Sequence, residues 1–282
     1  MKQIERKILQ GVAAFAVAFA SFFAAGKCYA QTLSGYDVMK KADDVPEPKT
    51  SSYTATMTLV NKKGQTRVRE VIERSKDYGE VKKSVIVFVT PKDVAGVGYL
   101  MFEYPEKSDG TKKDGDNWLY MPAMKKTKRI SGSETGGDFM GTDFTYDDMG
   151  DRGLKKDDFA LLGTENVEVE GGIGGVSSVS CYKVECIAKD KSEKNPRRIL
   201  WISCDEFLLV KGEFYDRQNE LQRTLICSDY GKQGGFWKTG KMVMTNVQTD
   251  HSTTIEMKNV VYNNAIDDNM FTVSALENGR VR

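Results

Sequence analysis

The sequence of 282 residues has one histidine, six prolines and five cysteines. A Ser-His-Asp or Cys-His catalytic relay needs a histidine, and His251 lies in the polar segment QTDHSTT, where we expect a solvated turn residue. Neither a G-x-S-x-G motif nor a C-x-x-C spacing occurs, which disfavours a serine hydrolase and a zinc cluster. The sequence therefore favours a protein that is not an enzyme and that has no metal or cofactor. A hydrolase with two catalytic carboxylates is the alternative, although no motif selects the pair.

The chain also lacks an excess of charge of either sign. It has 41 basic and 40 acidic residues, and 37 and 39 remain beyond residue 30. A polyanion requires a strongly basic surface, so nucleic acid is disfavoured as a partner.

Long apolar runs are missing except near the N-terminus. A basic start, MKQIERK, precedes an apolar run over residues 11–25, and Cys28 and Ala30 are the small residues that a signal peptidase reads. An uncleaved anchor is the alternative, but the run is shorter than the roughly 20 residues of a spanning helix. We therefore predict a signal peptide over residues 1–30 and an exported protein that starts at Gln31.

Four cysteines remain after this cleavage, and export to an oxidising compartment permits disulfides. A hairpin centred on DKSEKNP would place Cys181 roughly opposite Cys204, so we predict a disulfide between these two. Cys186 and Cys227 would lie strands apart and are predicted to be small buried hydrophobic residues.

The rest of the chain is rich in β-forming segments. SYTATMTLV alternates apolar residues with threonine, as a half-buried strand does, and similar segments predict ten or eleven strands. Helices are expected over residues 33–45, where Ser34 is a candidate cap, and near residues 146–163 and 266–276.

So many strands with so few helices predict a mainly β fold. We expect one strongly curved antiparallel sheet or an open barrel of about 11 strands, in a single domain over residues 31–282, because a flat sheet of this width would expose a large apolar face. SVIVFV is apolar on both faces, and one explanation is a core on one face and short helices as a lid over an apolar cavity on the other. The alternative is an ordinary packed sandwich, which composition alone favours.

Two blocks carry a more specific signal. WLYMPAMKKTKRISGS is followed by FMGTDFTYDDM. In order and spacing these blocks resemble the outer membrane lipoprotein-sorting family, the LolA-like proteins.

The resemblance implies an open half-barrel with a lid over an apolar cavity, in a periplasmic carrier that binds the acyl chains of a lipid or lipoprotein without covalent chemistry. It also implies an inner-membrane lipid exporter and an outer-membrane acceptor as partners, and an arginine that locks the lid, for which Arg67, Arg69 and Arg129 are candidates. The alternative is an exporter-associated or envelope-assembly interaction protein without carrier activity, and a lipid or glycan hydrolase is the third reading.

The predicted ligand-binding residues are apolar positions of the early strands and of the segment DFMGTDFTYDDM. Its acids Asp143, Asp147 and Asp148 are expected to cap turns and a helix start rather than to hold a metal, because three other residues separate Asp143 from Asp147. The predicted lining is Tyr53, Met57, Leu59, Val85, Val87, Tyr99, Met101, Trp118, Tyr120, Phe139, Met140, Phe144 and Tyr146.

Overall fold

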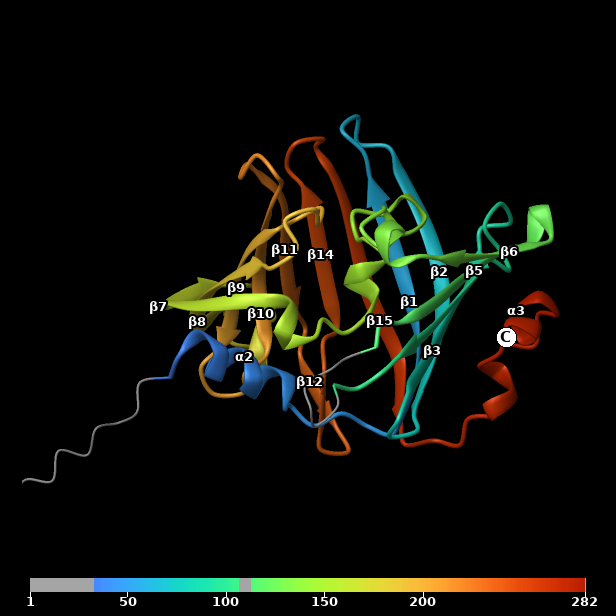
Figure 1. Ribbon diagram of the computed structural model, residues 1–282, viewed down its shortest axis with the longest axis horizontal. Helices are drawn as coiled ribbons and strands as arrows, with labels where there is room; N and C mark the ends of the chain where they lie inside the picture. The colour runs from blue at the N-terminus through green and yellow to red at the C-terminus, as the bar shows by residue number, and fades with distance from the viewer. Residues whose placement is uncertain (1–32, 107–112, 282) are drawn as a thin grey trace, which may run out of the picture. The chain divides into compact units, whose positions relative to one another are not determined.

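The computed structural model describes residues 33–106 and 113–281, and the predicted signal peptide lies outside these residues. The part of the chain that begins at Leu33 forms one compact unit built on a single large antiparallel sheet (Figure 1). Within the described residues, no helix has the length and apolar character needed to cross a membrane.

The sheet has 13 strands in the order β6-β5-β4-β3-β2-β1-β15-β14-β11-β10-β9-β8-β7, and it does not close into a barrel. Two meanders, β1 to β6 and β7 to β15, meet where β1 pairs with β15. The strands are β1 (Thr50–Val60), β2 (Thr66–Asp77), β3 (Lys82–Thr90), β4 (Gly98–Glu103), β5 (Asp116–Met121), β6 (Lys126–Ile130), β7 (Asp157–Glu168), β8 (Ser178–Ala188), β9 (Arg197–Ser203), β10 (Leu209–Tyr215), β11 (Leu221–Ser228), β14 (Lys241–Asn246) and β15 (His251–Tyr262), with a separate hairpin of β12 (Gly231–Gln233) and β13 (Phe236–Lys238).

The predicted fold class is confirmed, and the chain has more strands than expected: β7 and β12 form where no strand was expected, and two expected strands are each divided into two. Pro122 opens the short 3-10 helix η1 (Pro122–Met124), which splits one expected strand into β5 and β6. The segment WKTGKMVMTNVQTD contains two strands, β13 and β14, rather than one.

The helix predicted near residues 146–163 is wrong. The structure has two single-turn 3-10 helices there, η4 (Asp147–Met149) and η5 (Leu154–Lys156), and strand β7 starts at Asp157. Backbone pairing with β8 holds β7 in the sheet along its length, apart from a bulge between Leu161 and Gly163, and this pairing overrides the weak local preference for a helix.

Helices predicted at the two ends of the domain are confirmed. In α2 (Gly35–Asp43) the Ser34 hydroxyl accepts from the Asp37 backbone, and the Asp37 carboxylate accepts from the Ser34 N–H at 2.9 Å, which is a capping box. Gly35 lets α2 lie close to β7, because a Cβ there would be 2.8 Å from the Ala160 backbone. The buried Val38 of α2 packs on Val184 and its neighbours in β8 and β9.

The two faces of the curved sheet are covered differently (Figure 1). The concave face carries α2 at the β7 to β9 end and the segment of residues 138–149 at its centre. On the other, convex face, α3 (Val273–Glu277) packs against β4, where Gly98 leaves room for the Leu276 side chain. The remaining short helices are η2 (Gly132–Glu134), η3 (Phe139–Gly141), η6 (Ile173–Gly175) and η7 (Asp268–Met270).

The predicted disulfide is not formed, and Cys181 and Cys204 are both free thiols. The β8–β9 register pairs Cys181 with Ser203, one residue before Cys204, whose N–H donates to the Ser180 carbonyl at 2.9 Å. Because side chains alternate across a strand, this offset of one residue turns the two thiols to opposite faces. Cys186 and Cys227 are buried, as predicted.

Candidate functional site

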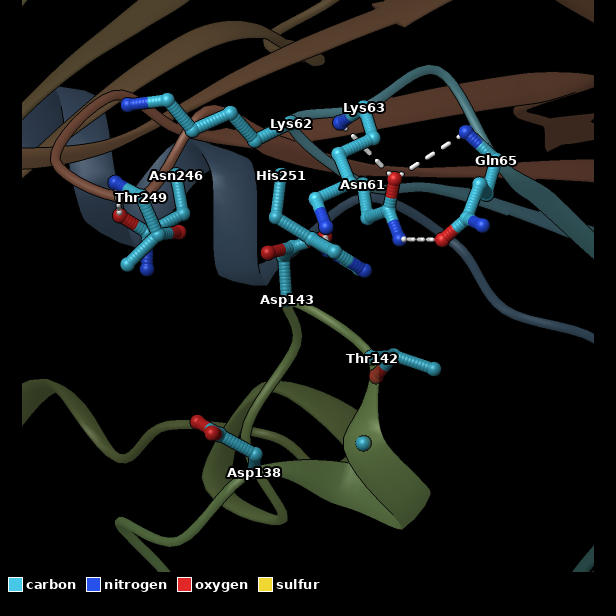
Figure 2. Close-up of a pocket in the computed structure, with 11 residues that line it drawn as sticks. Asn61, Lys62, Lys63, Gln65, Asp138, Thr142, Asp143, Asn246, Thr249 and His251 are labelled. Atoms are coloured by element: carbon cyan, nitrogen blue, oxygen red, sulfur yellow. Dashed lines mark hydrogen bonds and ion pairs between the residues drawn. The ribbon is translucent and has the colours of Figure 1, made fainter.

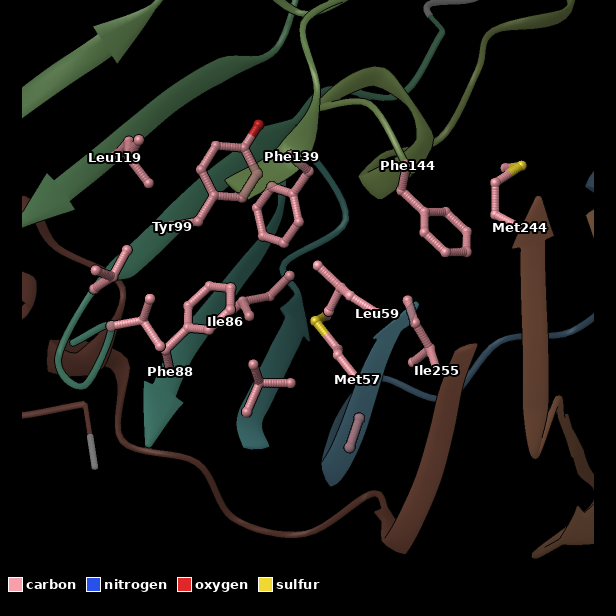
Figure 3. Packing of buried hydrophobic residues seen from close by; sticks show 14 of the residues in the cluster. Met57, Leu59, Ile86, Phe88, Tyr99, Leu119, Phe139, Phe144, Met244 and Ile255 are labelled. Carbon is pink, nitrogen blue, oxygen red and sulfur yellow. The ribbon is translucent and has the colours of Figure 1, made fainter. Parts of the chain in front are cut away.

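The centre of the concave face is occupied by residues 138–149, which we call the plug loop. Phe139 is fully buried, and its ring centroid lies 6.0 Å from that of Phe88, 5.4 Å from that of Tyr99 and 5.5 Å from that of Tyr146 (Figure 3). Phe144 points from the same loop toward the strands. The loop thus inserts aromatic rings into the most apolar part of the sheet, where they take the place of a second sheet or a helix.

The turn that presents Phe139 is held by the backbone. The Phe139 N–H donates to the Phe144 carbonyl at 2.7 Å, and the Thr142 N–H donates to the Phe139 carbonyl at 2.9 Å. Met140 and Gly141 both have positive φ, 51° and 74°. A non-glycine residue at positive φ is uncommon, so the tertiary contacts of the loop must hold Met140 there.

Arg69 of β2 anchors one end of the turn. Its Nη1 donates to the Met140 carbonyl at 2.6 Å, and its guanidinium lies over the Phe88 ring, 5.9 Å from the centroid. Arg129, another of the arginines considered for a lid lock, instead pairs with Asp116 at the surface. Of the three candidates, Arg69 is the one that donates a hydrogen bond to the plug loop within the part of the chain that the structure describes.

A second anchor comes from the opposite meander. The buried Arg223 of β11 donates through Nη1 to the Asp143 carbonyl at 2.9 Å and to the Asp148 carboxylate at 2.5 Å. Its Nη2 donates to the Asn195 side-chain oxygen at 2.7 Å. One buried cation therefore ties the second half of the plug loop to the sheet.

The third anchor corrects the prediction that His251 is a solvated turn residue. His251 starts β15, and its Nδ1 lies 2.7 Å from Oδ2 of Asp143, which also accepts from the Thr253 hydroxyl at 2.7 Å (Figure 2). Asp143 thus fastens the loop to β15 and caps no helix, whereas Asp148 does cap a turn by accepting from the Thr145 N–H at 2.7 Å. Among residues 33–106 and 113–281, no three metal-ligating side chains converge.

The structure brings nine of the thirteen predicted lining residues together on the concave face, in one cluster with the plug loop. The other four lie on the convex face, in the cluster under α3. The error has a simple cause: β3 is apolar on both sides, and Ile86 and Phe88, not Val85 and Val87, face the plug loop. The concave residues are Tyr53, Met57, Leu59, Tyr99, Met101, Phe139, Met140, Phe144 and Tyr146, and the convex ones are Val85, Val87, Trp118 and Tyr120.

The predicted apolar cavity is filled rather than open, because the plug loop packs against its walls. Open space lies at the rim, beside the β1–β2 turn, in two adjoining cavities. The rim cavity, of about 640 Å³, is lined by Leu59, Asn61, Gln65, Thr66, Arg67, Arg69, Met140, Gly141 and His251. The turn cavity, of about 480 Å³, is lined by Asn61, Lys62, Lys63, Gln65, Asp138, Gly141, Thr142, Asp143, Asn246, Thr249 and His251 (Figure 2).

An acidic side chain sits in the concave face away from the rim. Glu73 of β2 accepts a hydrogen bond from the Tyr53 hydroxyl of β1. Burial raises the pKa of Glu73 from 4.5 to about 7, and the Tyr53 hydrogen bond and the Lys82 charge oppose this rise only in part. The Glu73 carboxyl therefore changes charge near neutral pH.

We expect Glu73→Gln to remove a pH dependence of stability. Folded Glu73 keeps its proton up to about pH 7, while an unfolded glutamate loses it near 4.5, so the free energy of unfolding falls as pH rises between these values. The variant should match the wild type near pH 4 and exceed it by about 2 kcal/mol at pH 8. Urea unfolding at both pH values measures this, with the exposed Glu70→Gln as control. A difference that does not change with pH would contradict the assignment.

The fold and the plugged concave face define a class of protein, an open half-barrel whose apolar interior is covered by a loop. Comparison with known proteins agrees with this class. A family model described as "Uncharacterized protein" matches residues 80–278. None of the curated proteins matches the chain significantly.

Solved structures give closer matches. A DUF1329 family protein from Desulfovibrio piger is 29% identical, with a TM-score of 0.76 over 86% of this chain and 97% of that one. A putative outer membrane lipoprotein-sorting protein domain from Vibrio parahaemolyticus is 27% identical, with a TM-score of 0.75 over 86% and 98%. A LolA superfamily protein from Nitrosomonas europaea shares the fold, with a TM-score of 0.62 at 16% identity over 86% and 99%.

The chain therefore belongs to the family of that model, and this family is LolA-like. The resemblance seen in the two sequence blocks is confirmed.

Proposed function

We propose that this protein is a non-enzymatic periplasmic carrier that binds the acyl chains of a lipid or lipoprotein on its concave face. The observation that carries the proposal is the plug loop: the most apolar surface of the sheet is covered by a short irregular segment, held at its margins by polar anchors. A segment of this kind is released more easily than a helix or a strand. Release of the plug loop would leave an apolar trough of the kind that acyl chains fill.

The energies are of the right order for exchange between loop and ligand. Burial of an acyl chain gains roughly 0.8 kcal/mol per methylene, so a chain of about sixteen carbons gains roughly 12 kcal/mol. Withdrawal of Phe139 costs about 3 kcal/mol, and loss of each charge-assisted hydrogen bond of an anchor about 1.5–3 kcal/mol. The gain from a long acyl chain therefore exceeds the roughly 4.5–6 kcal/mol needed to withdraw Phe139 and break the Arg69 anchor, and it is of the same order as the cost of releasing all the anchors.

Tyr99 gives further support. Its hydroxyl is buried and has no hydrogen-bond partner among the described residues. A buried hydroxyl without a partner costs about 1–3 kcal/mol. With the plug loop inserted, the Tyr99 hydroxyl is thus left without a hydrogen bond, close to the position where a ligand would replace Phe139.

The direction of transport follows from the partners that such a carrier would need. The Vibrio parahaemolyticus relative is described as a lipoprotein-sorting protein, and the signal peptide predicted here would deliver the chain to the periplasm. An inner-membrane lipid exporter would supply the ligand, and an outer-membrane acceptor would receive it.

The test uses an uncharged fluorescent probe, N-phenylnaphthylamine, whose emission rises in apolar surroundings. The wild type should bind it, and Arg69→Gln should bind it about tenfold more tightly, because the variant lacks the hydrogen bond that holds Met140. Arg129→Gln, which removes an exposed arginine of β6, is the matched control and should leave the affinity unchanged.

Native mass spectrometry of protein purified from its own compartment supplies the second measurement. We expect a bound lipid that organic solvent extracts. If no lipid copurifies and neither wild type nor Arg69→Gln takes up the probe, the carrier function is excluded. The protein would then be an interaction protein whose concave face binds no ligand.

A further inference from the structure

The rim cavity carries charge of one sign. Its charged side chains are the guanidinium groups of Arg67 and Arg69, which occupy alternate positions of β2 and therefore face the same side of the sheet, and the His251 imidazole lies with them. No carboxylate belongs to its lining. Arg67 is exposed and Arg69 is half-buried, so the cavity is accessible from solvent.

Neither guanidinium is neutralised. Arg152, Arg197 and Arg223 all form ion pairs with carboxylates, but Arg67 and Arg69 form none within residues 33–106 and 113–281. Burial lowers the pKa of Arg69, the charge of Asp93 opposes this change in part, and the Arg67 charge lowers the pKa further. The two guanidinium groups therefore repel each other, and a bound anion would relieve this repulsion.

The acids of the adjoining turn cavity do not supply that anion. The Asp138 carboxylate lies 2.6 Å from Nζ of Lys194. The buried Asp143 carboxylate is engaged by His251 and Thr253 (Figure 2). Both acids are therefore committed to contacts of their own.

The cavity is also amphipathic. Leu59 and Met140 also line it, and both belong to the apolar cluster that continues under the plug loop toward Met57 and Phe144. A molecule whose polar group sits between the two arginines would have its apolar part at the edge of the concave face. This head-and-tail arrangement matches an amphiphile better than it matches a wholly apolar ligand.

We propose that the rim cavity is a binding site for an anionic group, a phosphate or a carboxylate, held by Arg67 and Arg69. Two sources share this chemistry: the head group of the lipid that the concave face would carry, an assignment that rests on the proposed function, and a free phosphate ion. Guanidinium groups bind such oxygens with two parallel hydrogen bonds each. A bound anion also competes with the Met140 carbonyl for Arg69, so its arrival weakens one anchor of the plug loop.

The experiment compares two fluorescent phospholipids with identical NBD-labelled acyl chains, phosphatidylglycerol and phosphatidylcholine, which differ in net charge. The wild type should bind the anionic lipid more tightly, and this preference should shrink as salt is added. Arg67→Gln should reduce the preference roughly three- to tenfold while it leaves binding of the uncharged probe intact. Arg129→Gln is the matched control, an exposed arginine far along the sheet in β6, and should keep the full preference.

The third experiment adds inorganic phosphate alone. It measures the rise in melting temperature for wild type and for Arg67→Gln. A lipid preference that Arg67→Gln removes assigns the site to a head group. A phosphate-induced rise that Arg67→Gln removes, without any lipid preference, assigns it to the free ion. If Arg67→Gln changes neither quantity, the anion site is refuted. If neither lipid nor the uncharged probe binds, the carrier function fails, and the phosphate arm still decides the anion site.

Discussion

Replacement of Phe139 with alanine should lower the free energy of unfolding by about 3–5 kcal/mol. The ring is fully buried and packs against Phe88, Tyr99 and Tyr146, whose positions are fixed by three different segments of the chain. Alanine would leave a void that strands cannot close without breaking the sheet register. Urea unfolding followed by tryptophan fluorescence measures the loss.

Phe236→Ala is the matched control for this prediction. Phe236 is half-buried in the β12–β13 hairpin outside the large sheet, and it contacts Tyr262 edge-on, so we expect a loss of about 1 kcal/mol. Should Phe139→Ala fail to fold, Phe139→Leu is expected to lose about 1–2 kcal/mol. Equal losses for Phe139 and Phe236 would mean that the plug loop does not occupy the concave face in solution.

Arg223→Met should cost about 3–5 kcal/mol, even though methionine is apolar and similar in length. The guanidinium is buried, and it satisfies the Asp148 carboxylate, the Asp143 carbonyl and the Asn195 amide at once. Its loss leaves the partly buried Asp148 carboxylate without its counter-ion, and removes a donor from the Asp143 carbonyl and from the Asn195 side-chain oxygen. Unfolding by urea at neutral pH provides the measurement.

A double substitution separates the charge from the packing. If the unpaired Asp148 carboxylate causes most of the loss, Arg223→Met with Asp148→Asn should recover about 1–2 kcal/mol of it. Arg129→Met, which removes an exposed ion pair with Asp116, should change the stability by less than about 1 kcal/mol. A loss in Arg223→Met no larger than in Arg129→Met would contradict the buried anchor.

The sequence was sufficient to predict the fold in strands whose apolar residues recur with a clear period of two. In β1, apolar residues alternate with threonine, and Tyr53, Met57 and Leu59 all face the plug loop, as predicted. In β3 the period vanishes because both faces are covered, one by the plug loop and the other by α3. A strand that is apolar on both sides contains no information about which side is concave.

The anchors of the plug loop could not be found in this way. Asp143 and His251 are 108 positions apart, and Arg223 and Asp148 are 75 apart, so no local spacing links them. Their partnership depends on the order of strands in the sheet, which brings β11 and β15 beneath the loop. A single histidine in a polar segment looks solvated until that order is known.

The pairing of β1 with β15 at the middle of the sheet has a consequence for how the chain folds. Every other contact between neighbours in the sheet joins strands close in sequence, but Thr54 and Lys258, which pair across this seam, are 204 positions apart. Local hairpins form before distant ones because the loops they close are short. The two meanders therefore precede the seam, and a chain interrupted before His251 would present β1 and β14 as two bare edges, which are the surfaces most ready to pair with other chains.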